Sequence, residues 1–402
     1  MGLFHGNYFR DMQVAISLYQ KDYGEKQTKK VALRVAFWNL LYFLQPQSKK
    51  IAKGRSHPGE TTFAFLLDGG YGDHLLFANW LWYFLDYFKD EDIRVDIYYR
   101  SKSAETIFNF PLENVNLINA HKTILRAEEY DVAIEFGKHP FLLHVNEDKR
   151  AVGFHSACVS AFVENLYSFY QENRLMLDNK PYLDGMGSAR SIAQGKKRIQ
   201  EGDIGELFGI REEYAFPLEI HEDEEGYLAG LGLEKGCYIT VNRGWDADYK
   251  GEHMKAWSLK SCGDMIQRIK EKYPDVPVVV IGALREQAPD TTYADYDLVG
   301  KTTLEQVKVL LKYSKVHIDN EGGMVHLRHA LHGGPSIVLF GPTPVELFGY
   351  SENVNLKSDA CDIWCEWLTP DWTSRCPRGK EGSPCMEGIT SQMVLDEMEK
   401  LM

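Results

Sequence analysis

Glu321 and His326 flank a pair of glycines at the end of an apolar run, and together they could hold a phosphate. Residues 316–318 have the pattern of a buried strand, and residues 324–331 have the pattern of a helix. At a strand–turn–helix junction, free backbone N–H groups and the positive end of the helix dipole face one point. The pattern therefore predicts an anion site. A plain β–α turn with a buried histidine is the alternative.

A second turn of the same kind follows the apolar run at residues 62–67. The glycine-rich residues 68–73 come next, and residues 75–88 continue with helical periodicity. This turn lacks the G-x-G-x-x-G spacing of dinucleotide-binding folds, so it does not indicate a nicotinamide cofactor. It places Asp73 in the first turn of a helix, at the carboxyl end of a strand, where open α/β sheets bind ligands. Simple helix capping is the alternative role for Asp73.

Length and composition limit the classes of function. A chain of 402 residues is long enough for two domains, each with its own core. A net charge of −13 argues against a nucleic-acid-binding surface. The N-terminus lacks the apolar region of a signal peptide, and no run of eighteen apolar residues predicts a transmembrane helix. We therefore expect a cytoplasmic protein.

The first sixty residues are basic, with ten Lys and Arg against four Asp and Glu. Within them, residues 31–44 are strongly apolar and are flanked by lysines on both sides. This pattern suits a helix lying on the inner face of the cytoplasmic membrane, with its basic flanks on anionic lipids. A helix packed on the body of the protein is the alternative.

Apolar strands alternate with helical stretches along the chain, which is the pattern of an α/β fold. We predict a helical extension over 1–60, one Rossmann-like domain over 61–220 and a second over 221–402. Periodicity fades between residues 171 and 225, where we expect a linker or an irregular excursion, with the domain boundary near residue 220. The predicted strands are 62–67, 93–99, 115–118, 132–136, 151–154, 237–242, 278–281, 316–318 and 336–340. The predicted helices are 75–88, 259–273, 304–313 and 324–331.

Polar residues follow the strands of the second half and could bind a nucleotide. Asn242 and Arg243 come directly after one strand, and Lys255 precedes the next helix. A lysine can neutralise a diphosphate as a point charge. Glu286 follows another strand and could hydrogen-bond ribose hydroxyls, while Thr302 supplies a hydroxyl in a later turn.

These motifs, in this order, resemble glycosyltransferase family 9, the ADP-heptose:lipopolysaccharide heptosyltransferases and their relatives. The resemblance rests on Leu298-Val299-Gly300-Lys301-Thr302-Thr303-Leu304, on Glu321-Gly322-Gly323-Met324-Val325-His326, and on Leu339-Phe340-Gly341-Pro342-Thr343. The turn with Gly70, Gly72 and Asp73 resembles the N-terminal signature of the same family. The resemblance spans roughly residues 63–389 and is thin between 154 and 236. It implies a GT-B fold, in which two Rossmann-like domains face a cleft, with the donor on the C-terminal domain and the acceptor on the N-terminal one.

The resemblance also implies a mechanism. Family 9 enzymes are inverting transferases that need no metal or other cofactor for transfer. Asp73 would take the proton of the acceptor hydroxyl. Lys255 and the backbone N–H groups of Gly322, Gly323 and Met324 would stabilise the leaving diphosphate.

The remaining donor contacts follow from the same resemblance. Asn242 and Arg243 would assist at the diphosphate, Glu286 would hold the ribose, and Glu321 would hold the donor sugar. Glu321 stands where the family usually has Asp, and Gly322 stands where Ser or Thr is common. Both departures would reshape the pocket for the donor sugar without changing the class of reaction.

Four cysteines gather near the C-terminus, in the segment 361–385. Cys361, Cys365, Cys376 and Cys385 could bind a structural Zn²⁺ or iron ion, although their spacing departs from the common C-x2-C pattern. Buried free thiols are the alternative, because a reducing cytoplasm disfavours disulfides. Arg375 and Arg378 could instead bind an anionic acceptor.

The sequence thus predicts a bacterial glycosyltransferase of the cell envelope, in lipopolysaccharide biosynthesis. Its partners would be a nucleotide-sugar donor, ADP-heptose, and a saccharide or lipid-linked saccharide acceptor. Three alternatives stay open: a transferase for another nucleotide sugar, a non-catalytic sugar-nucleotide-binding protein, and an epimerase of the nucleotide sugar.

Overall fold

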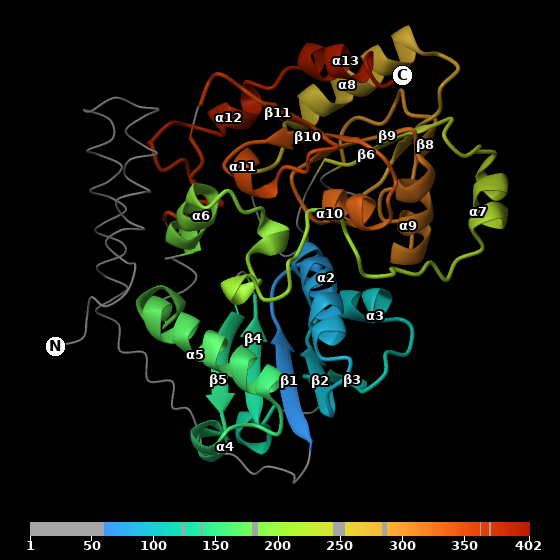
Figure 1. Cartoon of the computed structure of the whole chain (residues 1–402). Helices are drawn as coiled ribbons and strands as arrows, with labels where there is room; N and C mark the ends of the chain where they lie inside the picture. The colour runs from blue at the N-terminus through green and yellow to red at the C-terminus, as the bar shows by residue number, and fades with distance from the viewer. Residues whose placement is uncertain are drawn as a thin grey trace. The chain divides into compact units, whose positions relative to one another are not determined.

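The computed structural model describes residues 60–402, except 123–124, 138–139, 179–183, 244–253, 284–287, 362 and 370. Its described residues form two compact units, 60–219 and 220–402, which Figure 1 draws from blue to green and from green to red. Three predictions lie outside the described residues: the helical extension over 1–60, of which the structure describes residue 60 alone, its apolar segment 31–44, and the ribose contact of Glu286. No helix within the described ranges is both long and apolar enough to cross a membrane.

Unit 1 is built on a five-stranded sheet in the order β3-β2-β1-β4-β5. All neighbours are parallel except β4 and β5. The strands are β1 (Thr61–Leu67), β2 (Ile93–Tyr99), β3 (Val115–Asn119), β4 (Val132–Phe136) and β5 (Pro140–Val145). The chain runs from β1 to β3 on one side of β1 and then returns to β4 on the other side. The carboxyl ends of β1 and β4 therefore form a topological switch point, where open α/β sheets bind ligands.

An aromatic core covers one face of this sheet. Phe63 of β1 packs against Phe84, with ring centroids 5.1 Å apart, and against Phe162, with centroids 6.0 Å apart. Those two rings belong to helices α2 and α5, so both helices lie on the same face. The helices of unit 1 are α2 (Tyr71–Tyr87), α3 (Ser103–Ile107), α4 (Glu147–Val152), α5 (Ala157–Asp178) and α6 (Asp184–Ala193). Three short 3-10 helices are η1 (Ala127–Glu129), η2 (Arg198–Gln200) and η3 (Ile204–Glu206).

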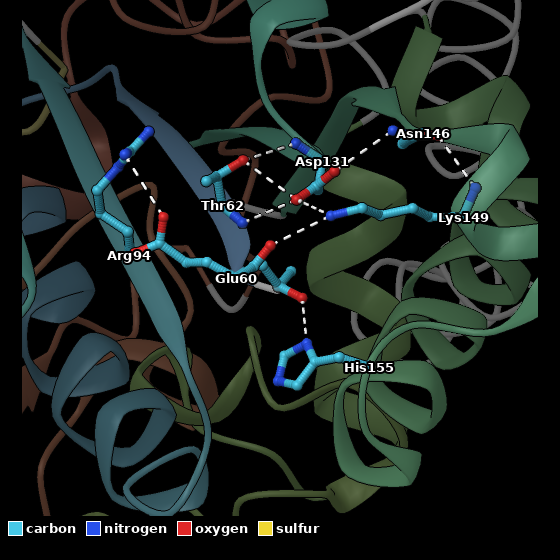
Figure 2. Close-up of polar contacts among 8 residues, drawn as sticks. Glu60, Thr62, Arg94, Asp131, Asn146, Lys149 and His155 are labelled. Carbon is cyan, nitrogen blue, oxygen red and sulfur yellow. Dashed lines mark hydrogen bonds and ion pairs between the residues drawn. The ribbon is translucent and has the colours of Figure 1, made fainter. Parts of the chain in front are cut away.

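A partly buried ion pair lies at the amino-terminal ends of the strands, as Figure 2 shows. Asp131, which directly precedes β4, accepts hydrogen bonds from the Thr62 backbone N–H at 3.0 Å and from Lys149 Nζ at 2.8 Å. Asn146 Nδ2 also donates to Asp131, at 3.3 Å. These contacts join β1, β4 and the start of α4. Because β1 and β4 are parallel, their amino-terminal ends lie together. These contacts are therefore at the opposite end of the strands from the switch point.

Two of the sequence predictions for unit 1 are wrong. Residues 151–154 are not a strand, because α4 ends at Val152; its N-cap Asn146 accepts a hydrogen bond from the Lys149 N–H and so fixes a helix there. The strand in this region is β5, which ends at Val145. The segment 171–225 is not simply a linker, because α5 extends to Asp178 and α6 follows it.

Unit 2 is built on a six-stranded sheet in the order β11-β10-β9-β6-β7-β8, and all its neighbours are parallel. The strands are β6 (Ile239–Val241), β7 (Val278–Val280), β8 (Tyr296–Asp297), β9 (Val316–Asn320), β10 (Ser336–Phe340) and β11 (Val354–Lys357). The main helices are α7 (Glu224–Leu231), α8 (Leu259–Lys272), α9 (Leu304–Tyr313), α10 (Gly323–Ala330) and α13 (Ser391–Met398), with short helices α11 (Val345–Phe348) and α12 (Pro384–Glu387).

Helices cover both faces of this second sheet. In Figure 1, α8 and α13 lie on one face, and α9 and α10 lie on the other. The switch point of unit 2 lies between β6 and β9, at the carboxyl ends of these two strands. The predicted α/β class, with two parallel-rich sheets in series, is confirmed.

Candidate active site

The turn after β9 brings three of the predicted donor residues together. Lys255 Nζ lies 2.5 Å from Glu321 Oε2, and His326 Nε2 lies 3.7 Å from Glu321 Oε1. Glu321 is only 6% exposed. Burial alone would raise the pKa of Glu321, but Lys255 and His326 outweigh it and hold this pKa at about 2. The cluster is therefore a buried carboxylate that stays ionised between two basic groups.

A tyrosine that the sequence did not single out fixes the imidazole. Tyr350 OH lies 2.6 Å from His326 Nδ1, and both residues are buried. The Tyr350 ring also stacks on His329, with centroids 3.6 Å apart. Because one ring nitrogen of His326 is engaged by Tyr350, the other is directed at Glu321.

The backbone around Lys255 is anchored from several sides. Asn320, the last residue of β9, donates its side-chain amide to the carbonyls of Arg243 at 2.5 Å and Lys255 at 2.6 Å. Next to Lys255, the Met254 N–H donates to the carbonyl of Thr373, at 2.8 Å. The position of the lysine is thus set by β9 and by the cysteine-rich segment.

Asn242 and Arg243 lie at the same switch point, at the end of β6. Asn242 Nδ2 donates to Asp319 Oδ2 at 3.0 Å, and Arg243 Nε donates to the carbonyl of Trp257 at 2.7 Å. Burial lowers the pKa of Arg243. In this structure both side chains hold neighbouring segments in place, next to the anchored backbone of Lys255.

The glycine pair begins the helix that faces the cluster. Gly322 is the N-cap of α10, and Gly323 and Met324 form its first turn. Thr302 lies in a different loop of the same edge, one residue before the N-cap Thr303 of α9. That loop is tied to the end of β7 by the Gly300 N–H, which donates to the carbonyl of Gly282 at 2.8 Å.

Asp73 lies at the switch point of unit 1. Its Oδ2 accepts the N–H of Gly70, the N-cap of α2, at 3.0 Å, and Gly72 lies beside it in the first turn. Gly69 has φ of +102°, and a Cβ there would come within 2.5 Å of Asp73 Oδ2. The turn therefore needs glycine at position 69, both for its backbone conformation and to make room for the carboxylate.

The predicted capping contact of Asp73 is present, but it is not the only one. Asp73 Oδ1 accepts a hydrogen bond from Arg198, whose terminal nitrogen lies 3.0 Å away. Arg198 stands in the segment expected to be a linker, so the sequence analysis missed it. The one available signal was its place in a polar stretch that also holds Glu201, three residues later.

The four cysteines of the C-terminal segment are all buried, and none of them forms a disulfide within the described residues. Burial raises the pKa of Cys365, and the thiols of Cys385, Cys361 and Cys376 raise it further. Arg378 lies 3.6 Å from Cys361 Sγ, and Arg375 lies 3.7 Å from Asp371. Within the described ranges, however, no three His, Cys, Asp or Glu side chains are arranged as they would be around a metal ion. The metal site stays a prediction.

Part of the chain matches the model of a known protein family. Residues 282–368 match the family model of glycosyltransferase family 9 (heptosyltransferase). The matched range includes Thr302, Glu321 and His326, and it excludes Asp73 and Lys255. No curated protein matches the chain.

Two solved structures of TibC share the fold, and other solved structures are similar in part. The dodecameric iron-containing heptosyltransferase TibC, in complex with ADP-D-beta-D-heptose, is 15% identical over 87% of this chain and 77% of that chain, with a TM-score of 0.52. TibC from enterotoxigenic E. coli H10407 is 15% identical over 88% and 80%, with a TM-score of 0.51. The E. coli ADP-heptose lps heptosyltransferase II is 15% identical over 85% and 98%, with a TM-score of 0.48. The match over residues 282–368 and the shared GT-B fold confirm the predicted resemblance to glycosyltransferase family 9, and this chain is accordingly placed among the glycosyltransferases.

Proposed function

We propose that this protein is an inverting glycosyltransferase that moves heptose from ADP-heptose to a hydroxyl of a cell-envelope saccharide. The observation that carries the proposal is the cluster of Lys255, Glu321 and His326 beside the first turn of α10. A diphosphate needs a cation and free N–H groups, and this switch point offers both. TibC, which has the same fold, was crystallised with ADP-D-beta-D-heptose, and this supports the choice of donor.

In the proposed reaction, a new bond forms between the acceptor oxygen and the anomeric carbon. The bond from that carbon to the diphosphate breaks on the opposite face, and ADP leaves with the electron pair. Asp73 takes the proton of the acceptor hydroxyl, since its carboxylate is 38% exposed and can meet a substrate. Lys255 and the N–H groups of the first turn of α10 stabilise the charge that builds on the leaving group.

The present contacts of Lys255 fit this role. Its ammonium group pairs with Glu321. A diphosphate would share that ammonium, and Glu321 would then be free to accept hydroxyl groups of the donor sugar. Glu321 in place of Asp, with Gly322 in place of a hydroxyl residue, would change the fit of the sugar but not the class of reaction.

The test begins with calorimetric binding of ADP, ADP-heptose, and UDP- and GDP-sugars to the purified chain. Selective binding of ADP-heptose supports the proposed donor, and selective binding of another nucleotide sugar replaces heptose with that sugar. Failure to bind any nucleotide contradicts the proposal. With the donor known, Asp73→Asn should keep donor affinity and abolish transfer. Retained transfer in this variant would exclude Asp73 as the base.

The acceptor and the metal are separate parts of the proposal. The acceptor would be a saccharide or lipid-linked saccharide, bound by residues 61–220, while the donor is bound by 221–402. A structural zinc or iron ion at the four cysteines would draw the thiolates together and need not take part in transfer. Elemental analysis of the purified chain should find about one metal ion per chain, and a metal-free but active protein would exclude it.

A further inference from the structure

We infer that Arg198 is a positioning residue for the proposed base Asp73, and that Glu201 holds Arg198 in place. This inference rests on the proposed role of Asp73 in transfer. Arg198 Nη2 lies 3.0 Å from Asp73 Oδ1, and Arg198 Nη1 lies 3.3 Å from Glu201 Oε2. One guanidinium thus bridges two carboxylates.

The two carboxylates that Arg198 contacts differ in their exposure to solvent. The side chain of Glu201 is fully buried, that of Arg198 is 5% exposed, and that of Asp73 is 38% exposed. A buried guanidinium needs buried acceptors, because water cannot solvate it there. The buried Glu201 therefore holds Arg198 through Nη1, while Nη2 contacts the more exposed Asp73.

Further contacts keep the arginine from moving. Ser191 of α6 donates its hydroxyl to Glu201 Oε1 at 2.8 Å. Arg198 Nη2 also donates to the carbonyl of Gly137, at the carboxyl end of β4, at 3.3 Å. The arginine is thus attached to both sides of the switch point, through Asp73 after β1 and through Gly137 after β4.

Asp73 is held on both oxygens by this arrangement. Arg198 engages Oδ1, and the Gly70 N–H engages Oδ2 at 3.0 Å. A general base must hold its oxygen within hydrogen-bond reach of the acceptor hydroxyl. A carboxylate fixed at two points keeps one orientation, whereas a carboxylate fixed only by the N-cap could turn away from the acceptor.

Removing the arginine alone would leave Glu201 buried without its partner, and the protein could fail to fold for that reason. The sharper variant is therefore the double change Arg198→Gln and Glu201→Gln, which removes both charges and keeps similar volumes. The single change Arg198→Lys keeps the positive charge but not the two-nitrogen bridge.

A matched control exists in the same unit. Lys149 forms a partly buried ion pair with the buried Asp131 at the amino-terminal ends of the strands, as Figure 2 shows. The change Lys149→Gln leaves the buried carboxylate of Asp131 without this cation, far from Asp73. It measures what general loss of stability does to transfer.

The experiment measures release of ADP from ADP-heptose, with heptose-free lipopolysaccharide as acceptor, and records Tm for each variant. The double variant should lower kcat by about a hundredfold with little change in the KM of the donor, since the effect of a misplaced group falls on the chemical step. Arg198→Lys should recover part of kcat, and Lys149→Gln should lower Tm while kcat stays near the wild-type value.

Two outcomes would overturn the inference: wild-type kcat in the double variant, or an equal fall of kcat in Lys149→Gln. Failure of the proposed function looks different. If Asp73→Asn transfers as fast as the wild type, the proposed role of Asp73 itself is wrong. If Asp73→Asn is inactive and the double variant is fully active, only the role of Arg198 is wrong.

Discussion

Lys255 Nζ and Glu321 Oε2 are 2.5 Å apart, although 65 residues of chain and the three strands β7, β8 and β9 lie between them in sequence. The pair forms because β6 and β9 are neighbours in the sheet, so that the loops at their carboxyl ends meet. Asn320 completes the junction by binding the carbonyl of Lys255. The donor site that we propose therefore depends on the crossover order of unit 2 and not on any single motif.

This pair makes the stability of the protein depend on pH. The folded state holds the pKa of Glu321 at about 2, below its usual value of 4.5, so the stabilisation is present above pH 4.5 and is lost as pH falls toward 2. A shift of this size corresponds to about 3 kcal/mol. Urea unfolding should show a wild-type advantage over Glu321→Gln that is largest near pH 6 and shrinks at lower pH. A constant advantage between pH 6 and pH 3 would contradict this.

Loss of the lysine should weaken donor binding. Lys255→Met removes the cation proposed to neutralise the diphosphate, and we expect the affinity for ADP to fall by about ten- to a hundredfold, which corresponds to about 1.4–2.7 kcal/mol. Calorimetric titration with ADP measures it. Lys235→Met is the matched control, because Lys235 is an exposed lysine of the same unit that pairs with Glu225. Equal affinity in the two variants would exclude Lys255 from the donor site.

Much of this arrangement could be predicted from the sequence, because buried parallel strands are continuous apolar runs with glycine-rich turns after them. The strands β1, β2, β4, β9 and β10 were expected within one or two residues. Asp73 in the first turn of a helix was also expected, since a strand and a helical pattern flank its turn.

The rest depends on tertiary contacts that leave no local pattern. Arg198 contacts Asp73 although the two are 125 positions apart in sequence. Neither hydrophobic periodicity nor a sequence motif predicts this contact. Tyr350 lies 24 residues after His326 and reads as an ordinary aromatic residue. The strand β5 was missed because it is a short antiparallel edge strand that begins with Pro140, which is a weak strand signal.

Tyr350 should affect donor binding through His326. Tyr350→Phe removes the hydroxyl that contacts His326 Nδ1 but keeps the ring that stacks on His329. We expect a loss of about 1 kcal/mol in the free energy of unfolding and a weaker affinity for ADP-heptose, because the imidazole loses its fixed orientation. Tyr238→Phe is the control, since Tyr238 OH donates to the carbonyl of Leu310 at 2.9 Å inside the same unit. If both variants bind the donor equally well, Tyr350 is only a packing residue.

The cysteine-rich segment should support the donor site through a single hydroxyl. Ser383 Oγ donates to the carbonyl of Met254 at 2.6 Å, directly before Lys255, and the Met254 N–H is held by Thr373 of the same segment. Ser383→Ala removes the hydrogen bond to the Met254 carbonyl, so the backbone next to Lys255 should be held less firmly. The loss of a hydrogen bond of about 1 kcal/mol corresponds to a fall of about fivefold in the affinity for ADP.

Ser374→Ala is the matched control for this effect. Ser374 belongs to the same segment, and its hydroxyl donates to the carbonyl of Asp371, at 3.3 Å. A fall in ADP affinity for Ser383→Ala alone means that the segment acts on the donor site through Met254. An equal fall in ADP affinity for both variants would mean that the segment affects the donor site through its overall stability. Unchanged ADP affinity in both variants would mean that the segment does not affect donor binding.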